Sequence, residues 1–375
     1  MAEDIIITMS EEDFIKSLTH PKSKKDYILE RNKKIKEIES CFKKEKRYLV
    51  DKVSNIIEQD KRHSSIINSC TSPFTHGPLS KTDYKFIRAA PLFELQLPNM
   101  DFLLFKRNSR CNIAIFGECK GSFSDPANVI KELKERRNHI EQKKDYIISN
   151  YLHLPESERI HFEYVIAVPD RDAARMHSYM IDKGGGFILW QASLTGTAEI
   201  SCIFPPKSLE SRKYMMHIDP DLNHCFNERK TLPCSRILID YFPQSYEFNK
   251  LSIFLNAATL SESSDAERIV TENDLTFIIK KNLFYMDDDF ISSAVADLIS
   301  KALEIEFLEK IDKRDDKCYK ITTKMQKIDS IERHLKAKWT KYILEKELEK
   351  KKNEAIIEMR KKFEKERKQK TLFDF

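Results

Sequence analysis

The first periodic signal in the chain is a recurrence of apolar side chains every seven residues in its N-terminal region. The recurring side chains are Ile28, Ile35, Phe42, Leu49 and Ile56. This spacing predicts a long amphipathic helix over 26–60. The second core position of the heptad is mostly charged, so the pattern favours a helix packed on its own domain, with an intermolecular coiled coil as the alternative. Residues 64–82 contain many Ser, Thr, Pro and Gly residues and are predicted to form a connecting loop.

After this loop, short apolar runs replace the helical period. The runs predicted as strands are 91–97, 100–105, 112–120, 162–169 and 187–192. Amphipathic helices are predicted over 126–149, with Asp125 as its N-cap, and over 171–182. Strands that alternate with helices in this way predict an α/β fold, with a mixed sheet flanked by helices.

The C-terminal half begins with a segment, 201–250, in which five prolines break every periodicity. The helices predicted after it are 250–260, 272–281 and 289–303. Two alternating runs around a polar turn then predict a β-hairpin over 306–322. Three helices followed by a two-stranded wing are typical of a winged helix. The last segment predicts one long charged helix over 327–368.

These patterns divide the chain into four predicted parts. They are a first domain at 1–200, an irregular connection at 201–250, a winged-helix-like domain at 251–326 and a basic helix with its terminal peptide at 327–375.

Composition narrows the class of protein. Charged residues make up 33% of the chain and hydrophobic ones 41%, with only 7 Gly and 13 Pro, which excludes collagen-like and wholly disordered chains. The chain contains no run of 18 apolar residues, and its N-terminal residues are acidic, so neither a membrane segment nor a secretion signal is expected. The 8 cysteines include no Cys-x-x-Cys pair, which indicates reduced thiols in the cytoplasm.

The net charge of +5 comes from one region. Residues 327–370 hold 16 basic and 9 acidic side chains, a balance of +7, which leaves −2 for the rest of the chain. A basic tail can neutralise phosphates, and it indicates a DNA partner and a nucleoid-associated location. The alternative is a solvated charged helix.

Three charged residues on two neighbouring predicted strands are suited to phosphodiester hydrolysis. Asp101 begins one strand, and the other ends with Glu118-Cys119-Lys120. Hard divalent cations prefer carboxylate oxygens, and they activate water and polarise phosphoryl oxygens. Glu118 and Lys120 share one face of a strand, so Cys119 offers the site only its carbonyl group. The alternative is an exposed ion pair between Glu118 and Lys120.

A second pair of polar side chains follows on the next predicted helix. Gln142 and Tyr146 are four residues apart and are therefore neighbours on one helix face. There they can hydrogen-bond a metal-bound water and the DNA backbone. The alternative is an ordinary helix surface.

The order of elements over 26–192, together with Asp101, Glu118-x-Lys120 and Gln142-x-x-x-Tyr146, resembles the PD-(D/E)XK nuclease superfamily. The resemblance implies a restriction-endonuclease-like fold, Asp101, Glu118 and the Cys119 carbonyl as ligands of Mg²⁺ or Mn²⁺, and Lys120 as the catalytic lysine. Gln142 and Tyr146 look like the additional motif of the RecB-like branch, with Gln142 in a catalytic role and Tyr146 on DNA. A further acidic ligand is expected, with Glu58 and Glu94 as rivals.

Two C-terminal features indicate partners. The predicted wing carries Lys313, Arg314 and Lys317, which are placed to contact DNA phosphates, whereas the preceding helix is acidic. The final residues resemble sliding-clamp-binding peptides. The side chains that carry this resemblance are Gln369, Leu372, Phe373 and Phe375.

The function expected from these features is a metal-dependent DNA endonuclease in restriction or anti-phage defence. One alternative is a repair or replication nuclease recruited by a sliding clamp. Others are a catalytically inactive winged-helix DNA-binding regulator and a structural scaffold built on the long helices. The sequence is compatible with a homodimer.

Overall fold

The computed structural model describes most of the chain. The described residues are 9–18, 20–108, 111–155, 158–183, 185–194, 197–205, 215–228, 234–235, 241–260, 268–311, 317–323 and 328–373. They form two compact units. One, named the sheet unit, is Ile56–Glu332; the other, named the helical unit, combines Met1–Asn55 with Arg333–Phe375. The long helices α3 (Pro21–Thr75) and α12 (Ile328–Phe373) each contribute residues to both units.

The helix predicted over 26–60 is confirmed, but it is longer than the sequence pattern indicates. The predicted loop at 64–82 is wrong, because α3 continues to Thr75 and a 3₁₀ turn, η1 (Pro78–Thr82), follows. Ile67 and Cys70 are buried against the sheet, and the Thr71 hydroxyl donates to the carbonyl of Ile67 at 2.9 Å. Burial of this face outweighs the low helix propensity of Ser and Thr, whose hydroxyl groups bond within the helix.

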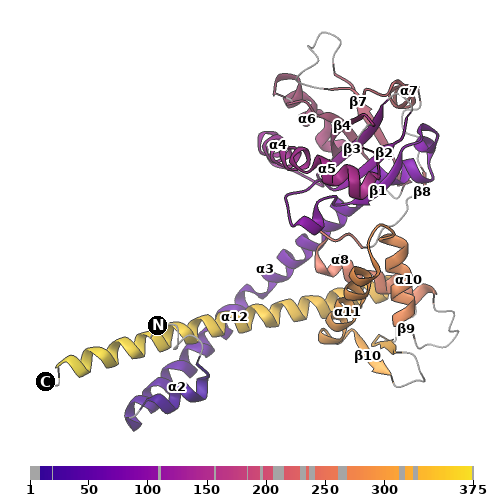
Figure 1. The fold of residues 1–375 in the computed structure, drawn as a ribbon. Helices are drawn as coiled ribbons and strands as arrows, with labels where there is room; N and C mark the ends of the chain where they lie inside the picture. The colour runs from indigo at the N-terminus through magenta and orange to yellow at the C-terminus, as the bar shows by residue number, and fades with distance from the viewer. Residues whose placement is uncertain are drawn as a thin grey trace. The chain divides into compact units, whose positions relative to one another are not determined.

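The sheet unit contains a six-stranded mixed sheet, as predicted for an α/β fold (Figure 1). Its strands, in spatial order, are β1 (Lys85–Ala89), β2 (Phe102–Lys106), β3 (Asn112–Cys119), β4 (Ile160–Pro169), β5 (Ile188–Ala192) and β7 (Ile200–Ile203). The first three strands are antiparallel, β3, β4 and β5 are parallel, and β7 is antiparallel to β5. A separate short pair joins β6 (Thr197–Ala198) to β8 (Cys234–Ser235).

Several strands differ from the sequence prediction, two of them in the six-stranded sheet. The predicted strand at 91–97 is wrong: this segment holds the 3₁₀ turn η2 (Phe93–Leu95), and the edge strand is β1 before it. Ala90 and Gln96 adopt left-handed backbone angles on either side of the turn, which takes the chain out of the extended conformation. The strand β7 lies inside the proline-rich region, where its four residues give too short a pattern to recognise.

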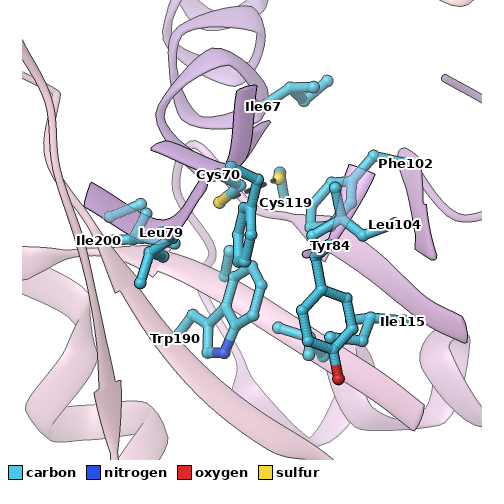
Figure 2. Close-up of a cluster of buried hydrophobic side chains, with 14 of the residues drawn as sticks. Ile67, Cys70, Leu79, Tyr84, Phe102, Leu104, Ile115, Cys119, Trp190 and Ile200 are labelled. Carbon is cyan, nitrogen blue, oxygen red and sulfur yellow. Dashed lines mark hydrogen bonds between the residues drawn. The ribbon is translucent and has the colours of Figure 1, made fainter. Parts of the chain in front are cut away.

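Helices cover both faces of the sheet. One face is covered by α4 (Pro126–Gln142), α5 (Lys144–Ile147), the π-turn η3 (Ile148–Leu152) and α6 (Asp170–Lys183). The other is covered by the end of α3 and by α7 (Pro220–Glu228), and its core includes Trp190 and Phe102 (Figure 2). The predicted helix at 126–149 is confirmed with Asp125 as N-cap, but it breaks at Lys143.

The later part of the sheet unit, residues 247–323, forms a smaller group of elements named the C-terminal module. Its elements are α8 (Glu247–Leu251), α9 (Ile253–Leu260), β9 (Ile269–Thr271), α10 (Glu272–Asn282), α11 (Asp288–Glu304), β10 (Leu308–Ile311) and β11 (Cys318–Ile321). The three predicted helices and the hairpin are confirmed. β9 pairs with β11 and completes a three-stranded sheet.

The helical unit consists of α2 (Glu11–Ser17), the first part of α3 and most of α12. Ion pairs join α12 to α3, with Lys351 Nζ 2.9 Å from Glu45 Oε2 and Lys352 Nζ 2.5 Å from Glu39 Oε1. At least one side chain of the heptad pattern, Phe42, is buried by contacts within the same chain. A search of the described helices finds none with the length and apolar character needed to cross a bilayer.

Candidate active site

Asp101 lies immediately before β2, at the end of the sheet where β3 finishes. Its backbone N–H donates to the carbonyl of Gly117 at 2.8 Å. Its Oδ2 accepts a hydrogen bond from the Cys119 backbone N–H at 2.6 Å and lies 3.0 Å from Nε2 of His63 on α3. The residue is only 5% exposed, so three elements, β2, β3 and α3, fix the position of its carboxylate.

Glu118 and Lys120 lie at the end of β3, on the same face, as the two-residue strand period predicts. Lys120 Nζ lies 3.0 Å from Oε1 of Glu118 and 2.9 Å from Oε2 of Glu132. The Glu118 side chain is only 3% exposed and that of Lys120 is 18% exposed. Glu118 and Lys120 therefore do not form the exposed ion pair that was the alternative, because the Glu118 carboxylate is buried.

The helix α4 supplies a second cation to this carboxylate. Arg136 pairs with Oε2 of Glu118, and its Nη1 also donates to the carbonyl of Asn99 at 2.8 Å. Glu132 and Arg136 are one helical turn apart, so one face of α4 brings both to the end of β3. Arg136 thus ties Glu118 to the segment that leads into Asp101.

These side chains line a cavity of about 820 Å³. The charged groups in its wall are His63, Glu94, Asp101, Glu118, Lys120 and Arg136. The wall also contains Phe93 and, from the C-terminal module, Phe290. Two acidic side chains from the ends of adjacent strands therefore open into one space, together with the predicted lysine.

Burial and mutual repulsion set the protonation of this cluster. Burial, with the neighbouring Asp101 carboxylate, raises the pKa of Glu118 to about 7. Burial alone would raise the pKa of Asp101, but the charge and hydrogen bond of His63 outweigh it and hold that pKa below its ordinary value. Burial opposes protonation of His63 as well, yet the Asp101 carboxylate raises its pKa to about 9. Asp101 is thus the more acidic of the two carboxyls.

The side chain of Cys119 points to the opposite face of the sheet, as predicted. Its Sγ lies 4.0 Å from Sγ of Cys70 in the core between the sheet and α3 (Figure 2). Burial raises the pKa of the Cys119 thiol. Only its backbone groups are available at the cavity.

Several predicted residues lie elsewhere. Gln142 is exposed at the end of α4, and Tyr146 packs against Tyr151 with ring centroids 5.5 Å apart. Neither is among the residues that line the cavity, so their predicted roles stay predictions. Of the two rival acids, Glu94 lines the cavity and Glu58 does not.

The predicted DNA and clamp contacts are only partly described. Lys317 is exposed and pairs with Glu272 at 3.0 Å. The predicted contacts outside the described residues or side chains are Lys313, Arg314, Gln369, Leu372, Phe373 and Phe375.

Sequence reasoning missed His63 and Arg136. His63 fell between the predicted helix, 26–60, and the predicted loop, 64–82; once α3 is extended, it lies four and seven residues before the buried Ile67 and Cys70 and shares their face. Arg136 gave no separate signal, because its helix carries many basic residues.

The described residues contain no cluster of three or more His, Cys, Asp or Glu arranged to hold a metal ion. The donors at the cavity are the carboxylates of Asp101 and Glu118, with Glu94 and the imidazole of His63 in the same wall. Mg²⁺ is commonly held by one or two protein carboxylates together with waters and substrate phosphate oxygens. The chemistry of these donors therefore fits Mg²⁺, with the remaining ligands from water and substrate.

Comparison with known proteins gives no assignment: no protein-family model matches the chain, and no curated protein matches it.

Proposed function

We propose that this chain is a metal-dependent deoxyribonuclease that hydrolyses phosphodiester bonds of DNA. The observation that carries the proposal is that Asp101, Glu118 and Lys120 line one cavity at the ends of adjacent strands. A bound Mg²⁺ or Mn²⁺ would polarise the phosphoryl oxygen and lower the pKa of the attacking water. Asp101 and Glu118 would hold the ion.

The lysine has a role of its own. The Lys120 ammonium lies between Glu118 and Glu132, at 3.0 and 2.9 Å. These contacts hold its charge beside the carboxylate that is the proposed metal ligand. From that position Lys120 stabilises negative charge that develops on the phosphate and orients the attacking water. Arg136, which pairs with Glu118, neutralises negative charge beside Lys120.

The fold adds support. A helix (α3), three antiparallel strands (β1, β2, β3), a helix (α4) and a parallel strand (β4) follow one another in the sheet unit. This is the element order on which the resemblance to the PD-(D/E)XK superfamily rests, with β1 in place of the predicted strand at 91–97. We therefore include the restriction-endonuclease-like fold, which the resemblance implies, in the proposal.

The C-terminal module is proposed to be a winged helix that contacts DNA. Its order, α9, β9, α10, α11, β10, β11, supports this interpretation. The exposed face of α11 includes Asp288 and Asp289, whereas β11 and the residue before it carry Lys317 and Lys320. Phosphate contacts from the hairpin are therefore favoured over base contacts from α11. A nuclease with its own DNA-binding module is suited to restriction or anti-phage defence, which is the biological role we propose by analogy.

The test is cleavage of supercoiled plasmid, linear duplex and single-stranded DNA with Mg²⁺ or Mn²⁺. The variants are Asp101→Ala and Lys120→Ala, with Lys131→Ala, an exposed lysine of α4 outside the cavity, as the matched control. We expect metal-dependent cleavage that both site variants lose and the control keeps. Salt-sensitive DNA binding without cleavage of any substrate would overturn the proposal in favour of an inactive DNA-binding regulator.

A further inference from the structure

The wall of the cavity includes two aromatic residues, and they come from different parts of the sheet unit. Phe93 lies in the turn η2, and Phe290 lies in the first turn of α11. Their ring centroids are 6.1 Å apart and their planes are perpendicular. The C-terminal module therefore forms part of the proposed active site as well as a candidate DNA-binding surface.

Both sides of this wall are fixed by local contacts. The N-cap residue Asp287 accepts a hydrogen bond from the Phe290 N–H at 2.7 Å, which sets the start of α11. On the other side, Glu94 next to Phe93 pairs with Arg88 and accepts a hydrogen bond from the Tyr151 hydroxyl at 3.1 Å. These contacts fix the chain on both sides of the wall, and the two rings support each other edge to face.

The backbone that carries Phe93 is also strained. Ala90 and Gln96, on either side of η2, have φ values of 46° and 53°, a region that side-chain-bearing residues rarely adopt. Both residues line the cavity. Backbone strain of this kind persists where the surrounding structure enforces it, and it gathers at ligand sites.

The amide of Asn99 provides a polar group in the same cavity. Asn99 lines the cavity, and its Nδ2 and Oδ1 are buried and have no hydrogen-bond partner among the residues that the structure describes. A buried amide without partners is costly, so such a group calls for an explanation. Rotation of this side chain toward the cavity would offer a donor and an acceptor side by side, the arrangement with which asparagine recognises the edge of a base.

The size of the cavity is compatible with one nucleotide. Its volume of about 820 Å³ falls within the range of pockets that hold one small ligand, roughly 300–1,000 Å³. A base inside a stacked duplex is not free to enter a pocket, and enzymes that take up a single base act on single strands or extrude one nucleotide. Aromatic side chains bind bases by stacking without regard to sequence.

We infer that the cavity binds one unstacked nucleotide of single-stranded or locally unpaired DNA, with its base on the Phe93–Phe290 wall and its edge at Asn99. The adjacent phosphate then lies at Asp101 and Glu118. This assignment of substrate class rests on the proposed nuclease function, but base binding itself requires no metal and no cleavage.

The experiment is a binding measurement in EDTA, so that its readout is independent of cleavage. Fluorescence anisotropy compares a labelled mixed-sequence single strand, its duplex and an abasic strand of equal length. The variants are Phe290→Ala, Phe290→Tyr and Asn99→Ala. Phe277→Ala is the matched control, because Phe277 belongs to the same module, is 63% exposed and does not line the cavity.

Wild type is expected to bind the single strand more tightly than the abasic strand, and Phe290→Ala should leave duplex binding, to which the hairpin is proposed to contribute, unchanged. Phe290→Ala should weaken single-strand binding by roughly 5- to 150-fold, the range found for loss of one stacked base. It should leave abasic binding within about twofold, whereas Phe290→Tyr restores binding. Asn99→Ala should weaken single-strand binding less than Phe290→Ala, and Phe277→Ala should behave as wild type.

Equal effects of Phe290→Ala and Phe277→Ala, or equal loss on the abasic strand, would overturn the inference. So would an equal loss of duplex binding in Phe290→Ala. If any of these outcomes is found but the protein cleaves DNA in a metal-dependent way, the nuclease proposal stands and only the base-binding inference is rejected. If the protein binds bases as expected but cleaves no DNA, the base-binding inference stands and the nuclease proposal is rejected.

Discussion

The Oδ2 atom of Asp101 accepts a hydrogen bond from the backbone N–H of Cys119 at 2.6 Å. This contact joins the start of β2 to the last residue of β3 and places the Asp101 carboxylate next to the strand end that carries Glu118 and Lys120. The Cys119 side chain, on the other face, packs in the core. The geometry of the proposed metal site is therefore tied to the packing of the sheet beneath it.

Gly117 is expected to be indispensable for that packing. A Cβ atom at Gly117 would overlap the ring of Phe102, its partner across β2 and β3. Gly117→Ala should lower the free energy of unfolding by about 1–3 kcal/mol, the usual effect of overpacking, measured by urea denaturation. Adding Phe102→Leu to Gly117→Ala should restore part of the loss, because the smaller side chain leaves room. A double variant whose loss equals the sum of the two single losses would show that the overlap is not the cause.

The His63–Asp101 pair predicts a pH-dependent stability. The pKa of His63 in the folded protein is raised to about 9, above the ordinary value of 6.5. Its contribution is therefore fully present below pH 6.5 and is lost as pH rises through 9. With its side chain 29% exposed, we expect a loss on the order of 2 kcal/mol, measured by urea denaturation without metal at pH 6 and pH 9.5.

His63→Gln is the control for this measurement. It should remove the His63 part of the difference, whereas Glu118, whose pKa of about 7 lies in the same interval, still causes some loss of stability as pH rises. If the variant and the wild type lose equal stability over this interval, another group is responsible.

A second buried network should control the stability of the sheet. Trp190 Nε1–H donates to His217 Nε2 at 2.9 Å, and His217 Nδ1 lies 2.5 Å from Oε2 of Glu163. Because an indole only donates, Nε2 must accept and the proton lies on Nδ1, so the imidazole in this arrangement is neutral. His217→Ala should reduce the unfolding free energy by about 3 kcal/mol or more, since it leaves the buried Glu163 carboxylate short of a partner.

Thermal or urea unfolding of His217→Ala beside His76→Ala, a variant of an exposed histidine, gives the comparison. The His76 variant should remain near wild type. A loss below about 1 kcal/mol for His217→Ala would mean that water replaces the missing partner.

The proposed phosphate contact of Lys317 predicts a change in salt dependence. Replacing one lysine that neutralises a phosphate should reduce the slope of log affinity against log salt by roughly 0.9 for duplex DNA. Lys317→Ala should show this reduction in anisotropy titrations. Lys280→Ala is the control, because Lys280 is exposed on α10 and, like Lys317, pairs with a carboxylate, at 2.7 Å from Asp288. Equal slopes for the two variants would argue against a phosphate contact at the hairpin.

The sequence by itself determined the elements with strong local signals. The α/β class, the strand that ends in Glu118-Cys119-Lys120, the Asp125 cap and the helices of the C-terminal module follow from apolar periodicity and capping, which are properties of neighbouring residues. The two-residue strand period was also enough to place Glu118 and Lys120 on one face and the Cys119 thiol on the other. Asp101 was placed beside them because adjacent strands pair.

Only the tertiary structure decided where α3 ends and what it brings to the cavity. Ser, Thr and Pro after residue 63 weaken the local helical signal, but burial of Ile67 and Cys70 on the sheet outweighs it and carries His63 to Asp101. Likewise, the apolar run at 91–97 forms a turn, in which Ala90 and Gln96 leave the extended region and Glu94 accepts a hydrogen bond from the distant Tyr151. Long-range packing also places Arg136, Phe290 and Asn99 at the cavity. No periodicity along the chain encodes that packing, so the sequence could not single them out.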